Sequence, residues 1–134
     1  MRCCPYCARP CWRAKVLPQV TFIEHWDSTH WSIVPAPSDG RSAALTGISG
    51  TSPTGVWAVG YDTPAGASGP KTLTLFWNGT SWTNMPSPNP DGRSQLQAAT
   101  ATPAASTVWA VGLTGGADNP STGASGSPLA LENG

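Results

Sequence analysis

Short apolar runs, rather than long amphipathic segments, organise the hydrophobic pattern of this chain. The runs are rich in β-branched and aromatic residues and are bounded by Gly, Pro, Asn, Asp and Ser, a pattern typical of strands joined by turns. We therefore expect an all-β fold with almost no helix. The predicted strands are VTFIEHW (20–26), HWSIV (30–34), AALTGIS (43–49), VWAVGY (56–61), TLTLFW (72–77), SWTNM (81–85), LQAATA (96–101), TVWAVGL (107–113) and SPLALE (127–132).

The same pattern occurs twice along the chain. Trp, Thr, Trp and Pro have the same offsets in WDSTHWSIVP (26–35) and WNGTSWTNMP (77–86), a shift of 51 residues. VWAVG recurs unchanged at 56–60 and 108–112, a shift of 52 residues. Repeats of this length are typical of solenoids, propellers and arrays, in which a unit buries its apolar face only against a neighbour. We therefore expect stacked units of four antiparallel strands.

Two tryptophans flank the short turn in each copy of the longer phrase. We expect them to face each other across a hairpin, where a cross-strand aromatic pair contributes roughly 0.2–1 kcal/mol. Asn78-Gly79 is expected to close its hairpin with positive φ at both residues, and Asp27-Ser28 is a weaker turn former. The expected pairs are Trp26 with Trp31 and Trp77 with Trp82.

The VWAVG strands carry a second set of tryptophans. Trp57 shares a face with Val59, and Trp109 shares one with Val111, because alternate residues of a strand point to the same side. This spacing favours a packed core role over an exposed one. The repeat residues to which we assign a structural role are Trp26, Trp31, Trp57, Gly60, Trp77, Trp82, Trp109 and Gly112.

These motifs resemble a known repeat family. A turn, a Trp, a Pro-containing bend, an Arg, a small-residue strand and a strand ending in Val-Gly are similar to the Kelch-type repeats of galactose-oxidase-like β-propellers. They are also similar to the Trp-Ser-x-Val-Pro-Ser-Pro repeats of bacterial propeller proteins. Kelch repeats have a Gly doublet where this chain has one Gly followed by Tyr61 or Leu113. The matching residues are Trp31, Trp82, Arg41, Arg93, Trp57 to Gly60 and Trp109 to Gly112.

The resemblance covers residues 20–134 and implies four-stranded propeller blades. Propellers usually close with about 4 to 8 blades. About two blades cannot make a ring, so we interpret the chain as an incomplete propeller, a fragment whose exposed strand edges favour self-association. The expected parts are a half blade at 20–37, a full blade at 43–86 and a partial blade at 95–134.

Composition separates the first 19 residues from the rest. They hold all the cysteines and four of the seven basic residues, and we read them as a Cys/Arg-rich leader that is disordered. The spacing Cys-Cys-x2-Cys-x3-Cys leaves a metal site as a weaker alternative, because structural zinc sites usually pair two separated Cys-x2-Cys knuckles. We expect no cofactor. The cysteines are Cys3, Cys4, Cys7 and Cys11.

Charge gives little information about partners. Seven basic residues balance seven acidic ones, and only 10% of the chain is charged, so nothing favours nucleic acid as a partner. No apolar run reaches the roughly 18 residues that a membrane span needs, and the N-terminus lacks the apolar core of a signal peptide.

Candidate catalytic groups are few. His25, Asp27 and His30 could ligate a metal or act as acid and base, but the second copy has Phe76, Asn78 and Ser81 at these positions, which favours a solvated turn. The chain has no nucleophile elbow and no triad partner set. The propeller part has a single Tyr and no Cys, whereas the copper site of galactose oxidase needs Tyr, His and a Cys-modified Tyr. We therefore expect a protein without enzymatic activity.

The connections that differ between the copies are candidate binding loops. YDTPAGASGPK (61–71) and LTGGADNPSTGASG (113–126) occupy one equivalent place in the repeat, and insertions at one place map to one face, often the binding face. We expect Tyr61, Asp62 and Asp118 to lie there. The chain is thus expected to be part of a platform for a protein or another ligand. The alternative is the propeller portion of an extracellular carbohydrate-binding or carbohydrate-active protein, in which tryptophans stack on sugars.

Deleting residues 1–17 is expected to leave the β content unchanged in circular dichroism, because every predicted strand lies after this segment. Loss of folding on deletion would contradict the assignment of a leader. Stoichiometric zinc in the purified full chain would instead establish the cysteines as a metal site.

Overall fold

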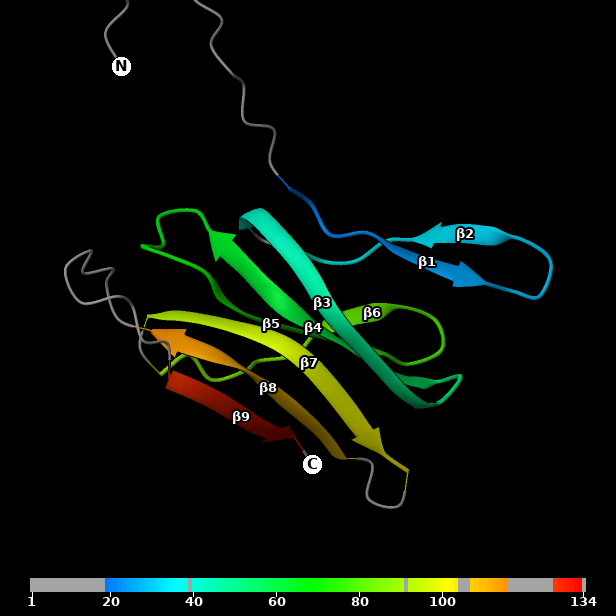
Figure 1. Ribbon diagram of the computed structural model, residues 1–134. Coiled ribbons are helices and arrows are strands. Elements are labelled where there is room, and N and C mark those ends of the chain that lie inside the picture. Colours follow the sequence, from blue (N-terminus) through cyan, green and yellow to red (C-terminus); the bar gives the residue numbers. More distant parts are fainter. Residues whose placement is uncertain (1–18, 39, 91, 104–106, 116–126, 134) are drawn as a thin grey trace, which may run out of the picture.

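The described residues of the chain fold into three antiparallel sheets (Figure 1). The computed structural model describes residues 19–38, 40–90, 92–103, 107–115 and 127–133. Within these residues there is no helix, and hence none that could cross a bilayer. The all-β prediction is confirmed. The strands are β1 (Ile23–Trp26), β2 (Trp31–Val34), β3 (Gly40–Ser52), β4 (Gly55–Pro64), β5 (Lys71–Trp77), β6 (Trp82–Asn84), β7 (Arg93–Thr102), β8 (Thr107–Gly115) and β9 (Ser127–Asn133).

Each sheet is built from neighbours in sequence. β1 and β2 form a hairpin, β3 to β6 form a central sheet in the order β3-β4-β5-β6, and β7 to β9 form a C-terminal sheet in the order β7-β8-β9. The central sheet is thus one full set of four strands. The hairpin corresponds to the last two strands of such a set and the C-terminal sheet to the first three, because the matching sequence phrases lie in them.

The tryptophan pairs lie where the repeated phrase predicts them. Trp26 pairs with Trp31 across the β1–β2 hairpin, and Trp77 pairs with Trp82 between β5 and β6. The ring centroids are 5.7 Å apart in the first pair and 5.6 Å in the second, with similar tilts of 46° and 43°. The cross-strand pairing expected from the sequence is therefore confirmed in both copies.

A β-bulge occurs at the same place in both long hairpins. The ladder shifts by one residue between Leu45 and Gly47 in β3 and between Leu96 and Ala98 in β7, positions that correspond in the repeat. A bulge bends the strand that carries it and increases its local twist. Both copies therefore share this local distortion as well as their strand order.

The glycine that ends each VWAVG run lies opposite the bulge. A Cβ on Gly60 would overlap the carbonyl oxygen of Ala44, and a Cβ on Gly112 would overlap that of Gln95. Neither glycine has positive φ, so space rather than backbone conformation requires it. The invariant Gly of the VWAVG phrase is thus explained by the close approach of the bulged strand.

Each sheet has two faces, which we name by their position in the repeat. The front face bears Trp57 and Val59 in the central sheet and Trp109 and Val111 in the C-terminal sheet. The back face is the opposite side. In the hairpin, the repeat places Ile23 on the front face, and the pairing of Trp26 with Trp31 places both tryptophans on the back face.

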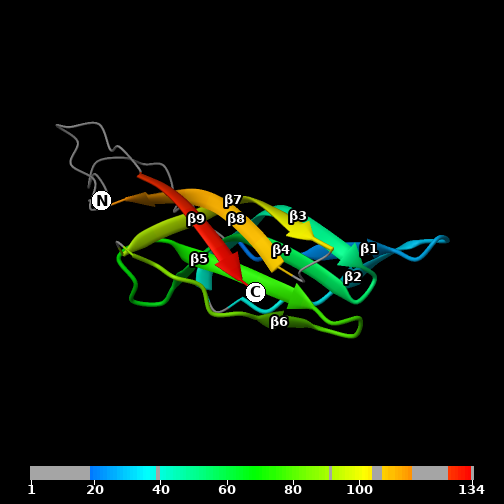
Figure 2. The ribbon, with the colours of Figure 1, turned by 90° about the horizontal axis from the view of Figure 1, so that it is seen from below.

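The sheets stack with the front face of one against the back face of the next. On the front face of the central sheet, Val59 is fully buried in one cluster with Leu96 and Ala110 of the C-terminal sheet. Two hydrogen bonds join the same sheets: Thr46 Oγ1 donates to the Leu96 carbonyl (2.7 Å), and the Ala101 N–H donates to Ser49 Oγ (2.9 Å). Figure 2, seen from below, shows the C-terminal sheet lying over the central one.

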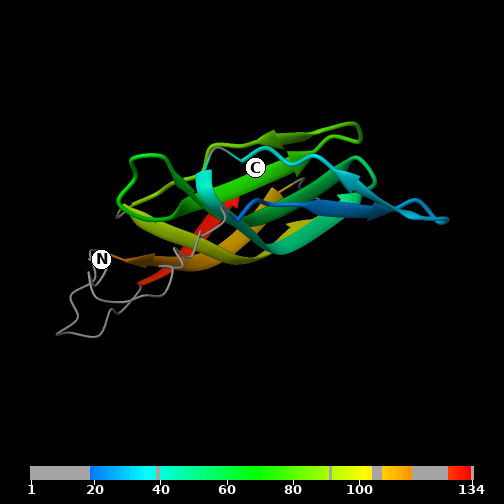
Figure 3. The same cartoon turned by 90° about the horizontal axis from the view of Figure 1, so that it is seen from above.

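The hairpin covers the opposite side of the central sheet, as Figure 3 shows from above. Ile23 packs against a core on the back face, formed by Ala43, Ala58, Leu73 and Leu75. The two stacking contacts share a backbone hydrogen bond at corresponding positions. Ala43 N–H donates to the Gln19 carbonyl (2.9 Å), and Ser94 N–H donates to the Pro70 carbonyl (2.8 Å). The hairpin thus sits on the central sheet as the central sheet sits on the C-terminal one.

Replacing Gly60 by Ala is expected to lower the free energy of unfolding by about 2 kcal/mol or more, because the new methyl group would force β3 and β4 apart. Gly112→Ala should have a similar effect on the C-terminal sheet. Denaturant unfolding of both variants would measure this. Gly55→Ala is the control, since its Cβ would meet only the Ser52 and Thr51 side chains. Equal stability of Gly60→Ala and Gly55→Ala would disprove the steric explanation.

Candidate functional site

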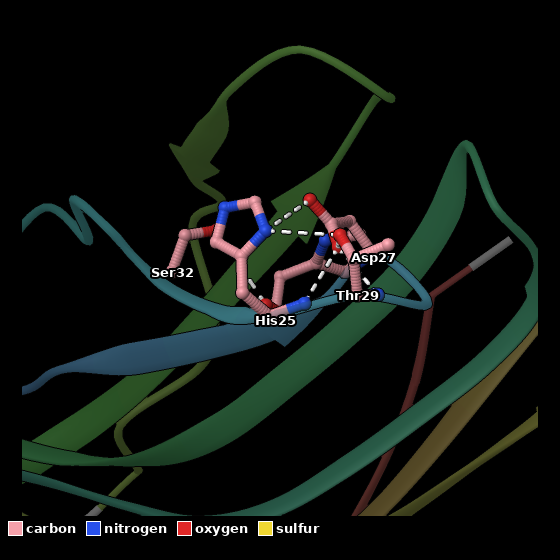
Figure 4. Close-up of polar contacts among 5 residues, drawn as sticks. His25, Asp27, Thr29 and Ser32 are labelled. Atoms are coloured by element: carbon pink, nitrogen blue, oxygen red, sulfur yellow. Dashed lines mark hydrogen bonds and ion pairs between the residues drawn. The ribbon is translucent and has the colours of Figure 1, made fainter.

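The candidate acid–base residues His25, Asp27 and His30 lie at the tip of the β1–β2 hairpin and beside it. Asp27 Oδ1 accepts hydrogen bonds from the Thr29 N–H (2.8 Å) and the His30 N–H (2.9 Å). Its other oxygen lies 3.0 Å from His30 Nδ1. Figure 4 shows these contacts gathered around the turn, with His25 and Ser32 on the adjoining strands. The carboxylate therefore organises the turn.

The corresponding turn between β5 and β6 has the same construction. Asn78 Oδ1 accepts hydrogen bonds from the N–H groups of Thr80 (2.9 Å) and Ser81 (3.0 Å). The second turn residue has positive φ in both copies, 98° at Gly79 and 82° at Ser28. The prediction of positive φ at both Asn78 and Gly79 is wrong, because the Asn side chain bonds the turn N–H groups and closes a four-residue loop.

These hydrogen bonds set the charge state of Asp27. The Thr29 hydroxyl, followed by the backbone N–H groups of His30 and Thr29, lowers the pKa of Asp27 below its ordinary value of 3.8. Hydrogen bonds to the ionised form favour that form. In the part of the chain that the structure describes, no three His, Cys, Asp or Glu side chains come together to hold a metal ion. The geometry here is that of a solvent-exposed Asx turn.

A small apolar groove lies between the hairpin and the back face of the central sheet. Its volume is about 130 Å³. One wall is formed by the Trp77–Trp82 pair, and Trp77 Nε1 donates to the Pro53 carbonyl (3.1 Å), which fixes the indole ring. The groove has few polar groups that could orient a ligand. Its lining residues are Ile23, Glu24, His25, Val34, Ile48, Pro53, Val56, Trp77 and Trp82.

A wider, more open hollow of about 340 Å³ lies beside β1. It exists because the hairpin has two strands where the central sheet has four, so β3 and β4 are only partly covered on their back face. Leu45, Ile48 and Ala58 line it from the central sheet, and Phe22 lines it from the hairpin. Ile48 is among the exposed large apolar side chains.

Two of the three predicted binding residues lie outside the exposed loops. β4 continues to Pro64, so both Tyr61 and Asp62 lie within a strand. Asp62 is only 5% exposed and pairs with Ala43 and Lys71 in the ladder. The expectation that Asp62 lies on an exposed binding face is therefore wrong, because strand pairing extends beyond the predicted end at residue 61.

The other candidates are placed as follows. Tyr61 is half-buried on the front face of the central sheet. Asp118 lies outside the described residues, as do the leader's first 18 positions with Cys3, Cys4, Cys7 and Cys11. The first variable connection (61–71) is described throughout, and the part of it outside the strands is the loop 65–70.

Arg93 fixes this loop, a role that the sequence did not reveal. Its Nε and Nη2 donate to the Ser68 carbonyl (3.3 and 3.0 Å), and its side chain lies over the buried Gly69. Gly69 leaves the space that the Arg93 side chain fills, since a Cβ there would overlap it. The only sequence signal is the DGRS phrase that both copies contain.

Equivalent tryptophans on the front faces differ in burial. Trp57 is half-buried and packs against Phe76, with ring centroids 4.7 Å apart. Trp109 is 44% exposed and Val111 is 50% exposed. The expected packed core at Trp109 and Val111 is thus not present in the described structure, because no described element lies on the front face of the C-terminal sheet.

No family model matches the chain, and comparisons with curated proteins and with solved structures found no match.

Protonation of Asp27 is expected to destabilise the hairpin. Because the folded-state pKa is lowered, the carboxylate stabilises the fold above its ordinary pKa, and this contribution is lost as pH falls through the lowered value. Thermal unfolding of the wild type and Asp27→Asn from neutral to acid pH would measure it. Asn keeps the turn acceptor, as Asn78 does, so Asp27→Asn should lose less stability in acid. Identical acid dependence of the two proteins would contradict this role.

Proposed function

We propose that this chain is a noncatalytic set of β-propeller blades, forming an incomplete propeller that acts as a platform for a protein or another ligand. The observation that carries the proposal is the stacking of each front face on the next back face, with the same bulge, glycine and backbone hydrogen bond at corresponding positions. Units that pack only on their neighbours are typical of propellers and related repeat folds. Stacked sheets of this kind form a rigid support for loops.

The preferred binding region is the edge of the sheets where the loop 65–70 connects β4 to β5. Arg93 holds this loop in place through Ser68, so a ligand would meet a preorganised backbone. Tyr61 lies close to it in sequence, and Asp118 belongs to the equivalent variable connection. Asp62 is not part of the proposed region, since it is buried.

A noncatalytic role agrees with the polar chemistry of the described residues. The Asp27 carboxylate, the one acidic group of the hairpin turn, bonds turn N–H groups and is held in the charged form, which makes it a poor general base. Thr72, a buried hydroxyl, is bonded to Ser87 and Asn89 of the β6–β7 connection. These polar groups support the fold.

Exposed tryptophans favour one alternative, a carbohydrate-binding role in an extracellular protein. Trp31 is 63% exposed and forms a tilted pair with Trp26 at the hairpin. An exposed indole face can stack on a sugar ring as it does on other flat apolar surfaces. The two functions place the ligand on different surfaces, the loop end or the hairpin.

Binding assays with matched variants would separate the two functions. The immobilised chain should retain protein partners that are lost when the exposed Ala65 and Ser68 are both changed to Asp and kept when the exposed Thr83 is changed to Asp. On a glycan array, the wild type and Trp31→Ala should both give no signal. A glycan signal that Trp31→Ala abolishes would establish the alternative, and binding unaffected by the two loop substitutions would refute the loop region.

A further inference from the structure

Among the described residues, the stack has an exposed apolar face at each end. At the C-terminal end, the front face of the C-terminal sheet exposes a row along β8, formed by Trp109, Val111 and Leu113. At the other end, the back face of the hairpin exposes Trp26, Trp31 and Ile33, and the exposed Phe22 precedes β1 and lines the adjoining hollow. Most of the exposed large apolar side chains of the described residues thus belong to these two surfaces, which we call the C-end face and the N-end face.

The interior of the same chain shows what covers a surface like the C-end face. Val59 and Val111 occupy the same position of the VWAVG phrase, yet Val59 is fully buried and Val111 is 50% exposed. The difference is the back face of a neighbouring sheet, which contacts Val59 through Leu96 and Ala110. The C-end face therefore carries, at Val111, the same residue that packs against a back face at Val59.

The polar positions of the internal contact also recur on the C-end face. Thr46 and Ser49 of β3 bond the backbone of β7 across the stack. The corresponding residues of β7 are Gln97 and Thr100, which are both exposed and both able to form such bonds. The C-end face thus carries hydrogen-bonding groups as well as apolar residues at the places where the internal contact uses them.

The N-end face is a back face. Its Trp26–Trp31 pair repeats the Trp77–Trp82 pair on the back face of the central sheet. The hollow beside it exposes Leu45 and Ile48, which correspond to residues of β7 that lie around Val59. The molecule therefore presents a front face at one end and a back face at the other, which are the two kinds of surface that pack together inside it.

We propose that a second copy of this chain binds head to tail, with its N-end face on the C-end face of the first. The contact repeats the front-on-back packing seen twice within one chain. Figures 1 to 3 place the hairpin and the C-terminal sheet on opposite sides of the central sheet, and each end face points away from that sheet, so both can be occupied at once. Such heterologous contacts form rings or open chains rather than closed two-fold dimers. A net charge of zero adds no long-range repulsion between copies. This inference goes beyond the proposed function, since it concerns the end faces and not the loops.

Single substitutions on either face should weaken association. The weight-average mass of the wild type, measured by sedimentation equilibrium, should rise steadily with concentration. Val111→Asp on the C-end face and Ile33→Asp on the N-end face should each raise the dissociation constant about tenfold or more, because a carboxylate would be buried without a partner. Thr83→Asp is the matched control, an exposed strand residue outside both faces, and should associate like the wild type.

Mixing the two variants tests the head-to-tail geometry. Val111→Asp keeps an intact N-end face and Ile33→Asp keeps an intact C-end face, so the mixture should form a one-to-one complex that neither variant forms with itself. Circular dichroism should show the same β content for both Asp variants. If Val111→Asp misfolds, Val111→Thr provides the test, because it keeps the β-branched shape and should still weaken association.

Three results would overturn the proposal. A wild-type chain that stays monomeric at all concentrations would show that the end faces do not bind another copy. Association that Val111→Asp abolishes and Ile33→Asp leaves unchanged would show two C-end faces binding each other. Association unaffected by both substitutions would place the contact elsewhere, such as the strand edges. None of these results bears on binding at the loop 65–70, which is tested separately.

Discussion

The contact between the front face of one sheet and the back face of the next is the interaction on which the rest of this structure depends. A sheet of three or four strands has two faces, and neither the central nor the C-terminal sheet is large enough to bury its apolar residues alone. Val59 is buried in a cluster with Leu96 and Ala110 of the C-terminal sheet. Leu73 and Leu75 are buried in the cluster on the other face, against which Ile23 of β1 packs. Gly60 serves the same contact indirectly, since it admits the bulge that shapes β3.

The repeat made much of this fold predictable. Strand identity, the tryptophan pairs and the four-strand period followed from residues 20–132, because alternation and turn chemistry are local. Strand ends were less predictable, and Asp62 shows why. Asp, Thr and Pro after residue 61 indicate a turn by composition, yet β4 continues because Lys71 of β5 pairs with Asp62 and β3 pairs with β4 as far as Pro64. Pairing partners distant in sequence decide where a strand stops, so the candidate loop was placed too early.

Side-chain roles were harder still to predict at the two hairpin turns, where different sequences form the same turn geometry. Asp27-Ser28 and Asn78-Gly79 look like turns of different strength, but both use a side-chain oxygen to bond two backbone N–H groups and both have positive φ at the second residue. The VWAVG phrase shows the opposite case, because its Trp and its second Val are more buried in the central sheet than in the C-terminal sheet. Trp57 and Trp109 stand in identical phrases, but their strand partners differ: Trp57 pairs with Phe76 of β5 and packs on its ring, whereas Trp109 pairs with Glu132 of β9. The C-terminal sheet also lies on the front face of the central sheet, and no described element lies on the front face of the C-terminal sheet.

Magnitudes decide what kind of assembly the end faces can support. Full burial of a large apolar side chain contributes about 1.5–3 kcal/mol, so covering the exposed halves of seven such residues, on both faces and at Phe22 beside them, would supply about 5–10 kcal/mol. Association costs about 4–15 kcal/mol in lost translational and rotational freedom. The apolar rows alone therefore roughly balance the cost, and the hollow at Ile48 and the polar groups at Gln97 and Thr100 determine whether binding is net favourable. Head-to-tail contact should accordingly be reversible and concentration-dependent. The contact between the central and C-terminal sheets differs, because both sheets belong to one chain and their packing does not require the association of two molecules.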